Sequence, residues 1–160
     1  MSNSKKSFKK ILAELEQWGS YESSAQPRDI SKLEGIKRLL RDLDNPEKNF
    51  KIIHIAGTNG KGLTASMISR LLEVHGFSSG CYTSPHLVHV RERISLNGTF
   101  VSESAFTKNA SRVLSIANDY KGNPYLSYFD ILTAIAFNVF LDCKVEWVVL
   151  ETGLGGRADS

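Results

Sequence analysis

The chain has 160 residues, of which 41% are hydrophobic, enough for the core of one globular domain and too many for a disordered chain. Its 20 lysines and arginines against 17 aspartates and glutamates give a formal charge of +3, too small to require a nucleic-acid or membrane partner. Neither the lysine-containing N-terminus nor the apolar run 134–141 resembles a signal peptide or membrane span, so we expect a cytoplasmic protein.

Apolar residues at helical spacing predict two amphipathic helices in the first part of the chain. The first covers 8–18 and ends near Gly19. The second covers 33–43, with Ser31 and Glu34 as a possible capping box, and stops at Asn45-Pro46. The polar stretch between them is predicted to be a loop.

A strand, a glycine-rich loop and a helix follow in order. The run 52–56 is short and β-branched, which predicts a strand covered on both faces by helices. The helix after the loop places one apolar face toward the sheet and ends at Gly76, and 77–83 is predicted to be the next strand. That face consists of Ala65, Ile68, Leu71 and Leu72. Such a β-α-β unit predicts parallel strands.

The second half alternates further elements. Residues 91–101 predict a hairpin around Asn97-Gly98 that leaves the sheet. Ser102 is predicted to cap a helix, 128–141 is apolar nearly all round and predicts a buried helix, and 145–150 predicts a third core strand. Cys81 and Cys143 are too few for a disulfide framework and are both predicted to be buried free thiols.

The segment Gly57-Thr-Asn-Gly-Lys-Gly-Leu63 has the features of a phosphate-binding loop. Its glycines allow backbone N–H groups to approach an anion, the helix N-terminus adds a favourable dipole, and Lys61 can reach terminal phosphates. The strict motif fails, because Ile55 stands at its first glycine and Gly62 at its hydroxyl residue. We therefore interpret the segment as a shorter variant of this motif that binds ATP.

Three strand ends are predicted to meet at one edge of the sheet. Because parallel strands present their carboxyl ends together, Lys61, Ser84 and Glu151 should share that edge. A carboxylate facing a triphosphate is repelled unless Mg²⁺ lies between them, so Glu151 is a candidate metal ligand. His54 and His89 lack partners at ligand spacing and are interpreted as structural.

Five segments together resemble the folylpolyglutamate synthase and dihydrofolate synthase family, a branch of the Mur-ligase-like ATP-dependent ligases. They are 55–62, 82–88, 91–94, 126–130 and 150–157. The resemblance implies an α/β fold like the Mur-ligase central domain, in which helices flank a parallel sheet in three layers. It also implies that 1–160 is the N-terminal part of this ATP-binding domain, truncated before completion, with the C-terminal glutamate-binding domain absent.

By position, the resemblance implies a site for each substrate. Thr58, Asn59, Gly60 and Lys61 match the ATP phosphate contacts, and Ser84 and Glu151 match magnesium ligands. The pterin or pteroate contacts correspond to Ser127, Tyr128, Phe129, Asp130, Ala158, Asp159 and Ser160. The implied reaction uses ATP and Mg²⁺ to phosphorylate a folate or dihydropteroate carboxylate, and glutamate attacks the acyl phosphate.

Some residues depart from the family pattern. Leu63 stands where the family usually has Ser or Thr, Asp130 where glutamate is common, and Ala158 where the family has leucine. We expect the 160 residues alone to be inactive and a full-length version to be monomeric. The alternatives are another Mur-type amino-acid ligase and a nucleotide-binding module without catalysis.

Overall fold

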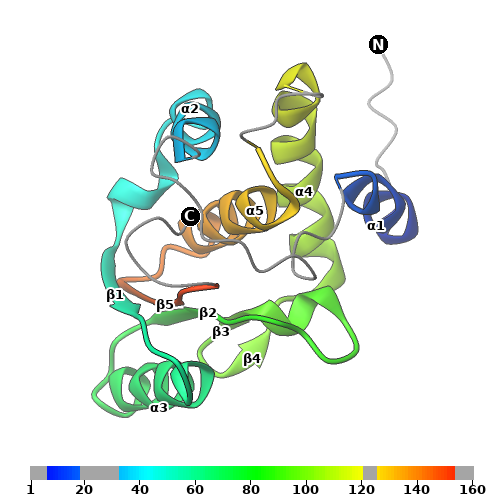
Figure 1. The fold of residues 1–160 in the computed structure, drawn as a ribbon. Coiled ribbons are helices and arrows are strands. Elements are labelled where there is room, and N and C mark those ends of the chain that lie inside the picture. Colours follow the sequence, from blue (N-terminus) through cyan, green and yellow to red (C-terminus); the bar gives the residue numbers. More distant parts are fainter. Residues whose placement is uncertain (1–6, 19–32, 121–125, 154–160) are drawn as a thin grey trace.

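The chain forms helical layers on both faces of one sheet (Figure 1). A computed structural model describes residues 7–18, 33–120 and 126–153. Helix α3 (Lys61–Val74) contacts β1, β5 and β2 from one side, and α5 (Tyr128–Asp142) contacts β2 from the other. The predicted three-layer α/β fold is confirmed.

Within the described residues the sheet has five strands in the order β1-β5-β2-β3-β4. Three neighbours run parallel, namely β1 (Lys51–Ile55), β5 (Trp147–Glu151) and β2 (Ser79–Tyr82). The hairpin strands β3 (Ile94–Leu96) and β4 (Thr99–Phe100) extend the sheet antiparallel beyond β2. The sheet is therefore parallel in its core and mixed overall.

The hairpin was predicted to leave the sheet, and this prediction is wrong. Asn97 and Gly98 do form its turn, with positive φ angles of 45° and 71°. The Asn97 side chain, however, accepts a hydrogen bond from the Ser79 backbone N–H at 2.9 Å, and the Asn97 N–H donates to the Ser79 carbonyl. These bonds hold the turn beside the start of β2, so the hairpin continues the sheet.

Strand β1 is less covered than predicted. Ile53 and Ile55 pack with the buried residues Ala65, Cys81 and Val149 beneath α3. Among the described elements, β1 ends the sheet on one side, and α5 contacts β2 on the opposite face. Ile52 is 41% exposed as a result.

Helix α3 also differs from the prediction at one position. Ala65 is fully buried, and Ile68 and Leu72 are half-buried against the sheet. Leu71 is 59% exposed, because it lies on the outer side of the helix with Leu63, Met67 and Val74. The two buried residues of the inner face, Ala65 and Ser69, have small side chains, which lets the helix approach the strands closely.

The remaining helices agree with the sequence pattern. They are α1 (Phe8–Glu16), α2 (Leu33–Asp42) and α4 (Glu103–Ala117). The Ser102 hydroxyl caps α4 by accepting from the Ala105 N–H at 3.2 Å. The capping box predicted at Ser31 lies outside the described residues. Short 3₁₀ turns occupy Pro46–Asn49 (η3), Val90–Arg93 (η4) and Asn118–Tyr120 (η5).

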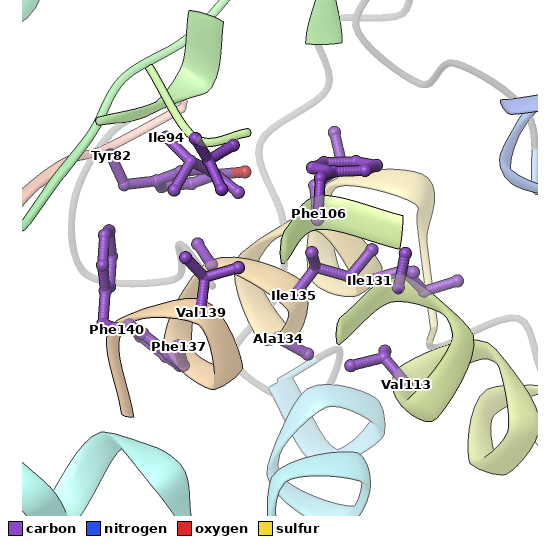
Figure 2. Packing of buried hydrophobic residues seen from close by; sticks show 14 of the residues in the cluster. Tyr82, Ile94, Phe106, Val113, Ile131, Ala134, Ile135, Phe137, Val139 and Phe140 are labelled. Atoms are coloured by element: carbon purple, nitrogen blue, oxygen red, sulfur yellow. The ribbon is translucent and has the colours of Figure 1, made fainter. Parts of the chain in front are cut away.

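Helix α5 is the centre of the larger hydrophobic core (Figure 2). It packs against α4 and α2, and its aromatic residues reach the sheet. The ring of Phe140 lies where a side chain at Gly80 would project, and the ring of Phe129 lies 5.8 Å from that of Tyr82, measured between centroids. The start of α5 therefore lies beneath the carboxyl end of β2.

Cys81 is buried as predicted, but Cys143 is exposed, so the prediction for the second thiol is wrong. Cys143 caps the C-terminus of α5, where the chain turns back toward β5 at the surface. No described helix is long and apolar enough to cross a membrane.

Candidate functional site

The loop after β1 presents an uncapped helix N-terminus. Gly60, with φ +74°, is the N-cap of α3, and its missing side chain makes no capping hydrogen bond. The first N–H groups of the helix consequently point toward an exposed loop that includes Thr58 and Asn59. Together with the helix dipole, these N–H groups form a favourable position for an anion such as phosphate.

Lys61 begins α3 and folds back over this loop. A side chain added at Gly57 would contact the Lys61 Cγ at 3.7 Å, so the stem of Lys61 lies beside the loop backbone. The lysine is half-buried. Its position at the base of the loop suits a cation that reaches a bound phosphate.

Glu151 enters the same region from the end of β5. It is paired with Ile55 of β1, and the following Thr152 N–H donates to the Ile55 carbonyl at 3.0 Å, which fixes the strand end. The side chain is only 7% exposed, and its Oε2 accepts a hydrogen bond from the Ser84 backbone N–H at 2.9 Å. Ser84 itself follows β2, before a cis peptide bond to Pro85.

The Glu151 carboxylate lies against the first turn of α3. An ideal Cβ on Gly62 would be 3.1 Å from Oε2 and 3.6 Å from both Cδ and Oε1. The structure thus brings Lys61, Ser84 and Glu151 to one edge of the parallel strands, as their spacing predicted. Sequence reasoning missed the proximity of Gly62 and Glu151, because residues 89 positions apart give no local signal of it.

Cys81 lies behind this edge and cannot act as a nucleophile near neutral pH. Burial, together with the smaller effects of the negative charges of Glu151 and Glu73, raises the pKa of its thiol to about 12. The reactive form of cysteine is the thiolate, which is scarce under these conditions.

The loop after Ser84 is stabilised by Glu92 of η4. The carboxylate accepts backbone hydrogen bonds from Leu87, Val88 and His89, at 2.8, 3.1 and 2.7 Å. These bonds lower the pKa of Glu92 below its usual value of 4.5, and the bond from the Leu87 N–H has the largest effect. His89 is the N-cap residue of η4, and its backbone N–H is one of these donors. Its interpretation as a structural histidine stays a prediction. His54 is an exposed residue of β1.

The segment 127–130 is built around a helix cap. The Asp130 carboxylate accepts from both the backbone N–H and the hydroxyl of Ser127, each at 2.6 Å, and the Ser127 hydroxyl accepts from the Asp130 N–H at 3.2 Å. Both residues are buried, Phe129 packs on Tyr82, and Tyr128 is half-buried. The predicted contacts Ala158, Asp159 and Ser160 lie outside the described residues.

Two surface hollows bordered by described residues lie away from the strand ends described above. One of about 430 Å³ borders α1 and Asn118. Another of about 350 Å³ is lined by Phe50, Lys144 and Glu146, which precede β1 and β5 at the opposite edge of the sheet. Neither hollow borders the phosphate loop. We therefore define the site by the polar groups that meet at the strand ends, those of Lys61, Ser84 and Glu151. In the described part of the chain, no three or more His, Cys, Asp or Glu side chains converge on a metal position.

Comparison with known proteins shows which family the chain is related to. No protein-family model matches the chain. The dihydrofolate synthase/folylpolyglutamate synthase of Bacillus subtilis is 40% identical over 130 residues, which cover 78% of this chain and 30% of that protein. The chain is a homologue of the folylpolyglutamate and dihydrofolate synthase family.

Solved structures of folylpolyglutamate synthases match the fold. The enzyme from Thermotoga maritima has a TM-score of 0.79 and 41% identity, covering 92% of this chain and 35% of its own. The Mycobacterium tuberculosis enzyme, complexed with ADP, has a TM-score of 0.76 and 35% identity, covering 93% and 34%. This homologue spans about a third of the length of those relatives.

Proposed function

We propose that this chain is the nucleotide-binding part of an ATP-dependent ligase that joins glutamate to a folate or dihydropteroate carboxylate. The observation that carries the proposal is the position of Glu151, whose buried carboxylate lies against the first turn of the phosphate-loop helix. The names of the relatives supply the substrate class, and the ADP of the mycobacterial structure supports the nucleotide.

In this proposal the loop residues bind the phosphates of ATP. Thr58, Asn59 and Gly60 present the backbone at the N-terminus of α3, and Lys61 carries the positive charge. The left-handed Gly60 allows the loop to turn into the helix without a side chain in the anion's path. A nucleotide held there would have its phosphates near the sheet edge that carries Ser84 and Glu151.

Ser84 and Glu151 fit a Mg²⁺ ion. Magnesium prefers hard oxygen ligands and is commonly bound by one or two carboxylates together with substrate phosphates and water. Glu151 offers a carboxylate already held by the Ser84 N–H, and the Ser84 hydroxyl belongs to the same residue. When bound, Mg²⁺ would neutralise charge between the β- and γ-phosphates.

The reaction needs no protein nucleophile. An oxygen of the substrate carboxylate attacks the γ-phosphorus and ADP leaves, which gives an acyl phosphate. The amino group of glutamate then attacks the acyl carbon, phosphate leaves, and the nitrogen loses a proton. The contribution of this chain is to hold the phosphates and their charge in position.

The pteroate part of the substrate is proposed to lie near the start of α5, with Ser127, Tyr128, Phe129, Asp130, Ala158, Asp159 and Ser160 as its contacts. The contact between Phe129 and Tyr82 supports this position, because it brings the helix start under the carboxyl end of β2. Since Ser127 and Asp130 cap the helix, we expect them to shape this subsite as well as to face it.

The relatives are about three times as long as this chain, so we propose that glutamate binding depends on residues outside the 160. The isolated chain should bind nucleotide without ligating glutamate. We assign it to the cytosol, where ATP and folates are available.

Calorimetry on the 160-residue chain tests the proposal. AMPPCP should bind more tightly with Mg²⁺ than without it, and Lys61→Ala should weaken binding by about 10-fold or more through loss of a charge-assisted contact. Lys144→Ala, at the opposite edge of the sheet, should bind as the unmodified chain does. No binding of AMPPCP under any condition would reject a nucleotide site.

A second titration separates the substrate classes. With AMPPCP present, dihydropteroate should bind and a uridine-nucleotide cell-wall precursor should not. The opposite preference would favour another Mur-type ligase. Binding of nucleotide alone, together with absence of ligation when the chain is extended to the length of its relatives, would favour a module without catalysis.

A further inference from the structure

We propose that Gly62 is a positioning residue, whose missing side chain leaves the space in which the Glu151 carboxylate sits beside the phosphate loop. This inference rests on the proposed function, in which Glu151 is a metal ligand. It adds a cause for the position of that ligand, namely the absence of a Cβ at residue 62.

The contact is closer than side chains normally allow. A Cβ on Gly62 would be 3.1 Å from Glu151 Oε2, and two further atoms of the carboxylate lie within 3.6 Å. Gly62 belongs to the helix and has an ordinary helical conformation, so backbone geometry does not require glycine there. Alanine forms helices better than glycine, so helix propensity does not favour glycine there either.

Neither partner can move away easily. Glu151 is held by the Ser84 N–H at its carboxylate and by the pairing of β5 with β1 at its backbone. Helix α3 is held by Ala65, which is fully buried against the sheet. An added Cβ would therefore push the carboxylate away by a few tenths of an ångström, and the hydrogen bond from Ser84 is the first contact to change.

The same geometry explains the departure from the strict phosphate-loop motif. That motif places Ser or Thr directly after the lysine and uses its hydroxyl to bind the metal. Here the position is Gly62, and a carboxylate oxygen from β5 lies 3.1 Å from where a Cβ would stand. Thr64 does not replace the hydroxyl, because its Oγ1 donates to the Gly60 carbonyl at 2.9 Å. In the proposed site, the Glu151 carboxylate of β5 therefore takes the place of the loop hydroxyl as a metal ligand.

The packing can be tested in the isolated chain without metal or nucleotide, by NMR of the Ser84 amide. In Gly62→Ala this amide should shift and exchange with solvent about 10-fold faster or more, because its acceptor has moved. Gly57→Ala is the matched control, since its Cβ would meet nothing closer than 3.7 Å. Circular dichroism should show that both variants fold.

The functional consequence is measured by Mn²⁺ binding in the presence of AMPPCP, followed by electron paramagnetic resonance. Gly62→Ala should weaken Mn²⁺ binding by about 10-fold to 100-fold, as expected for a group that orients a ligand. Shortening the acid in Gly62→Ala/Glu151→Asp should restore part of the Mn²⁺ affinity by withdrawing the carboxylate from the new methyl group.

The outcomes separate this inference from the proposed function. If Gly62→Ala leaves both the Ser84 amide and Mn²⁺ affinity unchanged, the inference is wrong while the metal site stands. If the unmodified chain with AMPPCP binds no Mn²⁺, the proposed metal site is wrong and the positioning role falls with it. A moved amide with weakened Mn²⁺ binding, recovered in the double variant, supports the inference.

Discussion

The ring of Phe140 in α5 packs directly over Gly80 in β2, where an added Cβ would lie 2.5 Å from Cδ1 and 2.6 Å from Cε1. Replacing Gly80 by alanine must displace the ring or the strand. We expect Gly80→Ala to lower the free energy of unfolding by about 1–3 kcal/mol, the usual cost of overpacking. Urea denaturation measures it. In Gly80→Ala/Phe140→Leu much of the loss should be recovered, and equal losses in both variants would contradict this cause.

The pKa of the Cys81 thiol depends on the charge of Glu151. Burial is the largest cause of its pKa of about 12, and the Glu151 carboxylate is the next. Glu151→Gln removes that negative charge, so the pKa of Cys81 should fall while staying above the usual value of 9.0. An alkaline NMR titration of Cys81 Cβ measures this shift. Glu146→Gln, at the other end of β5, should leave the thiol unchanged, and a fall of equal size there would count against the assignment.

The loop after Ser84 should open in acid. Backbone hydrogen bonds lower the folded-state pKa of Glu92 below 4.5, so their stabilising effect is present above about pH 4.5 and is lost as pH falls through the lower folded value. The amides of Leu87, Val88 and His89 should shift together with a midpoint below 4.5. Their NMR titration measures the midpoint. Glu92→Gln should abolish the transition, and a midpoint at or above the ordinary value would contradict the role of these bonds.

Residue 63 tests how much the loop helix contributes to metal affinity. Leu63 is 69% exposed, so Leu63→Ser should change the free energy of unfolding by less than about 0.5 kcal/mol. In a chain of the relatives' full length, the new hydroxyl should lower the Mg²⁺ concentration needed for ligation. Steady-state rates at several Mg²⁺ concentrations measure this requirement. An unchanged requirement would show that Leu63 has no effect on the metal.

The capping role of Ser127 can be separated from a role in substrate binding. Its hydroxyl accepts from the Asp130 N–H and donates to the Asp130 carboxylate, so Ser127→Ala should destabilise the chain by about 0.5–2 kcal/mol. Thermal unfolding measures the loss. Ser127→Thr keeps a hydroxyl and should retain most of the stability. If alanine lowers dihydropteroate affinity without changing stability, the residue acts mainly on substrate.

Local patterns in the sequence were sufficient for much of the fold. The apolar character of 128–141 correctly predicted a buried helix, and the order of strand, glycine loop and helix located the phosphate loop. The common edge of Lys61, Ser84 and Glu151 followed from a rule of parallel sheets, because strand ends meet whatever the loops between them do.

Contacts between distant residues were beyond such patterns. The hairpin joins the sheet because Asn97 bonds to Ser79, and the spacing of apolar residues carries no information about that bond. The packing of Glu151 on Gly62 depends on how far α3 lies from β5, which the small side chain of Ala65 helps to set. The exposure of Cys143 follows from the turn after α5 and not from its apolar neighbours in sequence.

The hydrogen bond that holds the Glu151 carboxylate comes from the main-chain N–H of Ser84. Most substitutions of residue 84 would therefore leave this bond in place. Any amino acid except proline at residue 84 would still donate that hydrogen bond, since the side chain takes no part in it. Exchanging Ser84 for alanine would thus delete one oxygen near the acid while leaving the acid in place. Evolution could alter the hydroxyl here without loosening the carboxylate beside it.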